Sequence, residues 1–226
     1  MDTGFLLESA EGVLVRNFII QNFSIGIRLN GSSKNKIIKN STIENTMGIA
    51  IFPKTAPPVA DSTENIIAYN LCKNNNTGIA LFSIGQLSVK DNIIQYNWVT
   101  KNADFGLILD GSDVQKNLIK KNKATDNRRG ITLVDASGNT VKLNRFSRNR
   151  VNGIRLEASA MKNQIKGNKA NNNGGDGIVL DANTIENVIE KNKAFGNSIF
   201  DIREEGTNTF IDNKCGTSSG EVDCLH

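Results

Sequence analysis

The chain has 226 residues, a formal net charge of +4 at pH 7 and only 38% hydrophobic residues. Lysine and arginine are spread along it without a long basic run, so nucleic acid is not predicted as a partner. No stretch of about 18 consecutive apolar residues occurs, and therefore no membrane-spanning helix is predicted.

A glycine that leads an alternating apolar segment recurs in steps of 22 to 30 residues. The positions are Gly4, Gly26, Gly48, Gly78, Gly106, Gly130, Gly153 and Gly177, and Asp201 takes the next one. A period of this length indicates a repeat architecture.

An asparagine motif, Asn-x-apolar-x-x-Asn, accompanies each period. Its nine copies are Asn17/Asn22, Asn35/Asn40, Asn65/Asn70, Asn92/Asn97, Asn117/Asn122, Asn139/Asn144, Asn163/Asn168, Asn187/Asn192 and Asn208/Asn213. The residue two after the first asparagine is mostly β-branched, as strands prefer: Ile19, Ile37, Ile67, Ile94, Ile119, Val141, Ile165, Ile189 and Phe210. Asparagine tolerates the left-handed backbone of a tight corner, and its amide can bond the same amide one coil above.

These patterns predict an all-β fold. Each period contains three short alternating segments, and none is long enough to form a crossover helix. Parallel strands must then pair from coil to coil, about 4.8 Å apart. We expect a right-handed parallel β-helix solenoid over residues 1–213, with about nine coils of 22–30 residues and three short strands per coil.

The first coil is apolar even at outward positions such as Leu6, Val13 and Phe18. Because solenoids need their open ends covered, we expect a partner, or another copy associating end to end, to cover this coil. Two insertions follow the first strand of later coils, at residues 53–61, which hold every proline, and at residues 85–88. Both are predicted to stand off one side of the solenoid, a side that often binds ligands.

Residues 214–226 leave the repeat and are predicted to form a C-terminal tail. Cys215 and Cys224 are expected to form a disulfide that ties this tail down, with two unpaired thiols as the alternative. A disulfide would indicate an exported protein. Cys72 falls in an inward column of the third strand and is predicted to be buried. The only histidine, His226, lies outside the repeat, so no Ser-His-Asp arrangement is expected.

In the first strand of each coil, the residue two positions after the glycine is predicted to face outward. These residues are Arg28, Ala50, Ala80, Ile108, Thr132, Arg155, Val179 and Arg203. Because several of them are small or apolar, they predict a shallow face that could receive a sugar chain or another protein.

An acidic stripe is predicted where this strand ends. It consists of Asp110, Asp135, Glu157, Asp181 and Glu205. Carboxylates stacked one coil apart repel each other unless a cation intervenes, and oxygen ligands suit calcium. The stripe therefore predicts either a calcium site or a solvated edge balanced by lysine and arginine.

Basic residues stand where the strand begins: Arg128 and Arg129, then Arg148 and Arg150 one coil later. Asp126 falls in register with Arg148, which predicts an ion pair between coils. Arg128 over Arg150 is a like-charge stack that an anionic ligand would relieve.

Aromatic residues mark one further position. Tyr69 and Tyr96 share a register on the second strand, and Trp98 lies just beyond. Their rings are expected to stack either on sugars or on each other.

Three Asn-Lys-Ala segments, at residues 122–124, 168–170 and 192–194, join the Gly-Ile-x-Leu and Asn-x-Ile-x-x-Asn repeats. From about Gly4 to Asn213 the chain resembles the parallel β-helix repeat superfamily of pectate-lyase-like folds. It is most similar there to NosD-type and right-handed β-helix region proteins. The closing Asn213-Lys214-Cys215 with Cys224 is similar to the ends of exported members. The resemblance specifies a fold and hardly any activity.

That superfamily includes pectate lyases, polygalacturonases, pectin methylesterases and alginate epimerases, whose sites generally lie on the outward face of the first strand. The chain lacks the histidine that polygalacturonases and alginate epimerases carry. The resemblance leaves one enzymatic option, a lyase that uses arginine with calcium. Arg129 or Arg155 would then abstract the proton beside a uronate carboxyl, and the ion would be held by Asp110, Asp135, Glu157 or Asp181.

Three hypotheses follow. The first is an exported, non-catalytic β-helix that binds a polysaccharide or a protein. Its candidate ligand-binding residues are Arg128, Arg150, Tyr69, Tyr96 and Trp98. The second is a calcium-dependent polysaccharide lyase acting on acidic glycans. The third is a scaffold, or a fragment of a larger β-helix protein, that stacks on a partner through its first coil.

Overall fold

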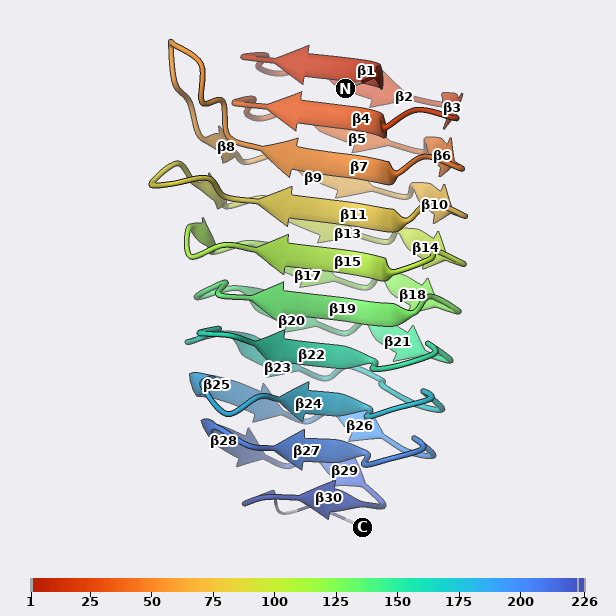
Figure 1. Cartoon of the computed structure of the whole chain (residues 1–226), viewed down its shortest axis with the longest axis vertical. Coiled ribbons are helices and arrows are strands. Elements are labelled where there is room, and N and C mark those ends of the chain that lie inside the picture. Colours follow the sequence, from red (N-terminus) through yellow and green to blue (C-terminus); the bar gives the residue numbers. More distant parts are fainter. Residues whose placement is uncertain (1, 223, 226) are drawn as a thin grey trace.

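A computed structural model describes residues 2–222, 224 and 225. The predicted fold is confirmed, because these residues form parallel strands stacked in coils of a β-helix (Figure 1). The described part of the chain contains no helix, and so none that could cross a membrane.

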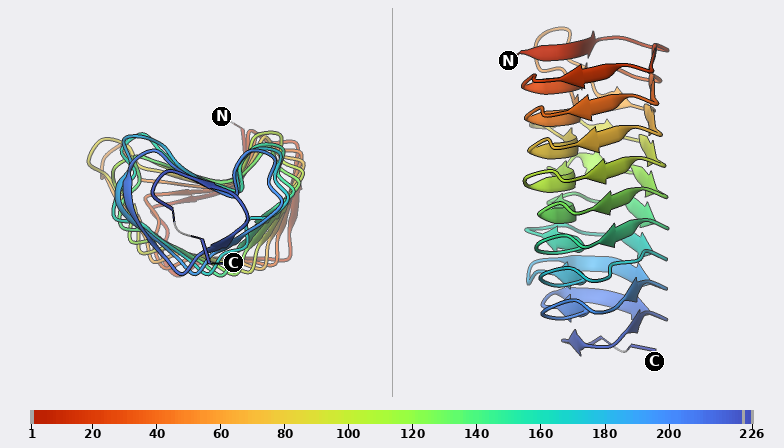
Figure 2. Two further views of the ribbon diagram at one scale, coloured as in Figure 1. Left: turned by 90° about the horizontal axis from the view of Figure 1, so that it is seen from below. Right: turned by 90° about the vertical axis from the view of Figure 1, so that its right-hand side faces the viewer.

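The first strand of each coil belongs to a ten-stranded parallel sheet. Its members are β1 (Thr3–Glu8), β4 (Ile25–Asn30), β7 (Met47–Phe52), β11 (Thr77–Phe82), β15 (Phe105–Asp110), β19 (Arg129–Val134), β22 (Ile154–Glu157), β24 (Ile178–Leu180), β27 (Ile202–Glu204) and β30 (Ser218–Ser219). Seen along the axis, the coils trace a kidney-shaped outline, and this sheet lies on the indented side (Figure 2).

The second strand of each coil belongs to a nine-stranded sheet. It contains β2 (Leu14–Arg16), β5 (Lys36–Ile38), β9 (Ile66–Ala68), β13 (Ile93–Gln95), β17 (Leu118–Lys120), β20 (Thr140–Lys142), β23 (Gln164–Lys166), β25 (Ile185–Glu190) and β28 (Thr207–Ile211). Three short strands, β8 (Ser62–Thr63), β12 (Val89–Lys90) and β16 (Val114–Gln115), form a separate sheet between the first and second strands of their coils.

The third strands form a six-stranded sheet and a two-stranded one. The six are β3 (Ile19–Gln21), β6 (Ser41–Ile43), β10 (Leu71–Lys73), β14 (Trp98–Thr100), β18 (Lys123–Thr125) and β21 (Arg145–Ser147), and the two are β26 (Lys193–Ala194) and β29 (Lys214–Cys215). Single parallel bridges at Lys169 join the two groups, so one column of third strands runs through the molecule.

The core is the stack of inward side chains. Ile119, Val141 and Ile165, from successive second strands, are fully buried, as the period-two pattern predicts. The predicted third-strand column is buried as well, and Cys72 lies within it with no exposed surface.

Buried asparagine ladders run along the corners, as predicted. The Asn97 amide donates to Asn122 Oδ1 at 2.9 Å, and the Asn122 amide donates to Asn144 Oδ1 at 3.1 Å. The backbone reason given for asparagine is wrong, however. The left-handed residue is the one before the ladder asparagine, such as Tyr96 or Lys121, in every coil except at Asn208. The side-chain amide bonds alone therefore account for asparagine in the ladder.

The first coil departs from the predicted register by four residues, because Val15, and not Ile19, pairs with Ile37. Asn17 and Asn22 take the left-handed position, so they do not belong to the ladders. Phe18 takes the ladder position, and its N–H donates to Asn40 Oδ1 at 3.1 Å. As a result Ile20 points inward, and Ile19, which the sequence placed in one column with Ile37, is 74% exposed.

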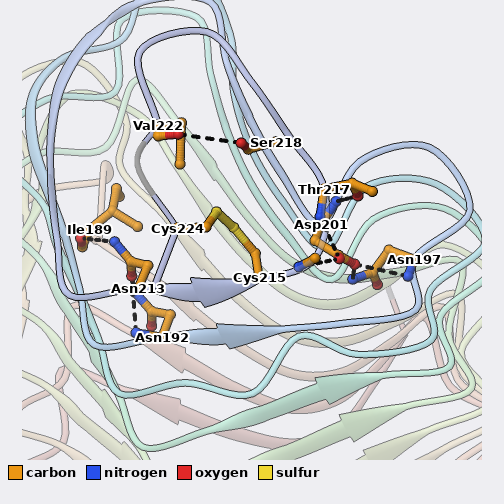
Figure 3. The surroundings of a disulfide bond; sticks show 11 residues. Ile189, Asn192, Asn197, Asp201, Asn213, Cys215, Thr217, Ser218, Val222 and Cys224 are labelled. Atoms are coloured by element: carbon orange, nitrogen blue, oxygen red, sulfur yellow. Dashed lines mark hydrogen bonds between the residues drawn. A yellow bond between two sulfur atoms is a disulfide. The ribbon is translucent and has the colours of Figure 1, made fainter. Parts of the chain in front are cut away.

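The C-terminal end is fastened by the predicted disulfide, Cys215–Cys224, whose Cα atoms lie 5.4 Å apart (Figure 3). Beside it, Asp201 accepts hydrogen bonds from the Asn197 amide and from the N–H groups of Gly216 and Thr217. The boundary at residue 213 stays a prediction, although β29 and β30 continue the sheets beyond it.

Candidate ligand-binding face

The outward surface of the ten-stranded sheet, called the front face here, presents three columns of side chains. The central column is Leu6, Arg28, Ala50, Ala80, Ile108, Thr132, Arg155, Val179 and Arg203. Before it lies a column that includes Ile25, Met47, Phe105 and Arg129, and after it one that includes Phe52, Phe82, Asp110, Val134 and Glu157.

The small residues of the central column form a covered floor. Ala50 and Ala80 are fully buried although they point outward, and Ile108 is only 6% exposed. Longer side chains of the flanking columns, among them Met47 and Phe82, pack against them. Ala50, Ala80 and Ile108 therefore point outward as predicted, but they contribute little accessible surface because flanking side chains pack against them.

Aromatic rings line the N-terminal half of the front face. Phe52 and Phe82 stack with their centroids 5.2 Å apart and their planes 18° apart. The Arg28 guanidinium lies 5.0 Å from the Phe52 centroid, and the Arg129 guanidinium lies 4.7 Å from that of Phe105. Each arrangement leaves a partly exposed cation beside an apolar ring.

The C-terminal half of the front face is ionic. Arg155 contacts Glu157 at 2.8 Å and Asp181 at 2.6 Å. Burial alone would lower the pKa of Arg155, but the hydrogen bond that Arg155 donates to Asp181 and the charges of both carboxylates raise it overall. Arg203 repeats the pattern with Asp176, at 3.0 Å. A raised pKa stabilises the protonated guanidinium, which works against Arg155 as a proton-abstracting base.

The basic cluster at the strand entrance is partnered. Asp104 accepts hydrogen bonds from Arg128 at 3.0 Å and from Arg129 at 3.2 Å. Arg150 donates to the carbonyl oxygen of Ala103 at 2.7 Å. Arg128 and Arg150 therefore both have hydrogen-bond partners within the protein. The buried Nε of Arg129, in the same cluster, has none in the described residues.

The predicted ion pair between Arg148 and Asp126 is present, with two hydrogen bonds of 3.0 and 2.9 Å. It lies at the corner that precedes the front face. Because Arg148 is exposed, this pair joins neighbouring coils at the surface.

The four acids predicted as calcium ligands are not gathered into one site. Strand pairing aligns Val134, and not Asp135, with Asp110 and Glu157. Burial raises the pKa of Asp110, and the nearby charge of Asp135 raises it further. The described residues contain no group of three or more histidine, cysteine or acidic side chains arranged to hold a metal. With Glu157 and Asp181 bound to Arg155, the arrangement does not fit a six- to eight-oxygen calcium site.

The predicted aromatic ligands lie elsewhere. Tyr69 and Tyr96 occupy the turns before β10 and β14, and not a strand as predicted, because both adopt the left-handed backbone. Their rings stack on each other, 5.0 Å apart and 2° from parallel. Trp98 begins β14, half exposed, with the Lys123 ammonium 4.9 Å from its ring. The predicted binding residues therefore occupy two separate surfaces.

Phe52, Phe82 and Phe105 were missed as candidates. The signal was present, because Phe52 and Phe82 each stand four residues after a repeat glycine. The sequence prediction considered only the central column, and these three residues lie in the columns beside it.

Comparison with known proteins identifies the repeat. The family model described as right handed beta helix region matches residues 1–117 and 93–215. No curated protein matches the chain in sequence.

Solved structures share the fold at low sequence identity. The periplasmic alginate epimerase AlgG is 18% identical, with 89% of this chain and 51% of that chain covered and a TM-score of 0.77. The A-module of a mannuronan C-5 epimerase from Azotobacter vinelandii is 17% identical, with coverages of 93% and 62% and a TM-score of 0.76. The Dettilon tailspike protein is 13% identical, with coverages of 93% and 54% and a TM-score of 0.71. The chain thus spans about half to three fifths of the length of these proteins.

Proposed function

The chain belongs to the right-handed β-helix region family, and we propose that its front face binds a polysaccharide that runs along the solenoid axis. The binding role is non-catalytic. It uses a surface that repeats from coil to coil, which suits a polymer whose units also repeat.

The proposal rests on the order of surfaces along the front face, where apolar rings are followed by charged groups. Stacked Phe52 and Phe82 offer a partly exposed apolar surface beside the floor of Ala50 and Ala80. Sugar rings have apolar C–H faces that pack on such surfaces, as ligands pack in mostly apolar sites with a few polar groups.

Charged groups continue the front face beyond the rings. Arg129 projects over Phe105 and keeps part of its surface exposed. A guanidinium is a rigid, multiple donor that suits hydroxyl and carboxylate oxygens. We therefore favour a glycan that carries carboxylates, and its acidic units would lie near Arg129.

The structural relatives support the same substrate class. Two of them are epimerases whose names refer to alginate or mannuronan. At 17–18% identity they share the fold, so the inference for this chain also depends on its own front face.

Export is part of the proposal. The Cys215–Cys224 disulfide supports it, because such bonds persist mainly in oxidising compartments. A glycan-binding β-helix in the periplasm or outside the cell would meet its ligand there.

The test is a glycan array followed by calorimetric titration of the glycans that are retained. The variant Phe82→Ala should weaken binding about tenfold, equivalent to about 1.4 kcal/mol. The matched control is Ile38→Ala, which truncates a partly exposed apolar residue on the nine-stranded sheet. Equal affinities for Phe82→Ala and wild type, or an equal loss in the control, would contradict the proposal.

A further inference from the structure

A second charged surface lies on the column of third strands, away from the front face. One cation from each of five successive coils stands at the same outward position. We call Lys123, Arg145, Lys169, Lys193 and Lys214 the basic ladder. All five side chains are exposed.

The side chains of the basic ladder form no ion pair with the residues that the structure describes. None of the ion pairs among residues 2–222, 224 and 225 includes any of its five side chains. The front face is different, because Arg155 and Arg203 each bind two carboxylates there. Like charges directly opposite each other on a sheet destabilise it, so an anionic ligand bound along the basic ladder would relieve this repulsion.

The surroundings of the basic ladder extend the positive surface. A hollow of about 450 Å³ lies against its first three members and is also lined by Tyr96, Lys121 and Leu143. Trp98, half exposed, precedes Lys123 in the same column. The surface is therefore an open positive strip that begins at an indole ring.

We propose that the basic ladder is a second binding surface, which holds a linear acidic polysaccharide along the solenoid axis. Its charges repeat once per coil, about 4.8 Å apart at the backbone, so a polymer with closely and evenly spaced anions can meet several of them at once. This surface goes beyond the proposed front-face function, because it uses another sheet and a purely electrostatic contact.

The aromatic residues favour a polysaccharide over a single-stranded nucleic acid. Nucleic-acid channels interleave cations with free rings on which successive bases stack. Here Tyr69 and Tyr96 stack on each other and Lys123 lies over Trp98. From Arg145 to Lys214 the ladder positions hold cations and no ring, so a base would find no platform there.

Trp98 gives a direct readout, because it is the only tryptophan of the chain and stands in the ladder column. Its emission should change when an oligomer of alginate is added to the full chain, and the affinity should fall as salt is raised. The triple variant Arg145→Gln, Lys169→Gln and Lys193→Gln should bind about tenfold more weakly.

The matched control removes the same charge from three exposed lysines in other columns: Lys36→Gln, Lys101→Gln and Lys116→Gln. It should stay within about twofold of wild type, since distant surface charges are screened. Phe82→Ala should keep the full Trp98 response, which separates this surface from the front face. Circular dichroism must show that every variant is folded. The salt dependence of alginate binding is measured on the wild type, so this part of the test does not depend on whether a variant folds.

Three results would overturn the proposal. One is an unchanged Trp98 emission at saturating alginate oligomer. Another is an equal loss of affinity in the two triple variants, which would indicate a general effect of net charge. The third is tighter binding of a single-stranded oligonucleotide, or of vesicles of anionic phospholipid, than of the alginate oligomer at the same salt concentration.

Discussion

Asn122 provides the sharpest test of how the coils are held together. Its buried amide donates to the carbonyl oxygen of Ile94 at 2.8 Å and to Asn144 Oδ1 at 3.1 Å. Its own Oδ1 accepts from the backbone N–H of Asn97 at 3.0 Å and from the Asn97 amide at 2.9 Å. One side chain thus joins three successive coils.

The variant Asn122→Ala removes all four of these hydrogen bonds. The Asn144 oxygen and the Asn97 amide keep other partners, the backbone N–H of Asn122 and the carbonyl oxygen of Ile67. The N–H of Asn97 loses its partner inside the protein, whereas the carbonyl of Ile94 belongs to a strand that stays paired with its neighbour. At about 1–3 kcal/mol for one buried group left unpaired, the free energy of unfolding should fall by about 1–3 kcal/mol.

Urea unfolding followed by circular dichroism measures this loss, provided that the slope with denaturant stays equal to that of wild type. The control is Asn76→Ala, an exposed asparagine outside the ladder, which should change stability by less than about 0.5 kcal/mol. A loss below about 1 kcal/mol for Asn122→Ala, or equal losses in both variants, would refute the reasoning.

Three further predictions concern single groups. The hydrogen bond from Arg148 holds the pKa of Asp126 below its usual range, so this contribution to stability is lost as pH falls through that pKa. NMR titration should show the Asp126 pKa rising in Arg148→Gln, and an unchanged value would exclude the pair as its cause. Burial raises the pKa of Cys72 to about 12, so an aromatic disulfide reagent should label this thiol only in denaturant. Labelling of the native chain would show that Cys72 is accessible. Reduction of Cys215–Cys224 should cost about 2–3 kcal/mol and speed amide exchange in β29 and β30 alone. Faster exchange in every coil would instead mean that the disulfide stabilises the whole solenoid.

The fold could be predicted because residues one sequence period apart lie opposite each other in neighbouring strands. Ile119, Val141 and Ile165 are 22 and 24 residues apart and lie in neighbouring strands of one sheet. In a parallel β-helix, equivalent positions of successive repeats form one column along the axis. The residue type that recurs at a position therefore indicates whether the column points inward or outward, and which residues are neighbours.

Errors arose where one residue decides the register. Asn17 fits the spacing of the motif, yet it occupies the left-handed position before Phe18, and Val13 takes the ladder position that the sequence assigned to Asn17. Asp135 likewise follows Val134, which takes the column position that the sequence assigned to the acid. Counting residues cannot place such a shift, because it depends on which turn residue adopts a positive φ.

The distribution of charge was also misjudged in the linear sequence. Lys123, Lys169 and Lys193 stand in the three Asn-Lys-Ala segments, separated by one or two periods. The chain therefore contains no basic run, but the coils bring these residues into one column. Charge in a solenoid has to be counted by column and not along the sequence.

The central claim is that the front face binds a polysaccharide, and mapping of backbone amide shifts by NMR tests it most directly. The chain would be titrated with an oligosaccharide that the glycan array retains. The account predicts the largest shifts in β7, β11, β15 and β19, around Phe82 and Arg129. Saturable binding that leaves these four strands unshifted would contradict it.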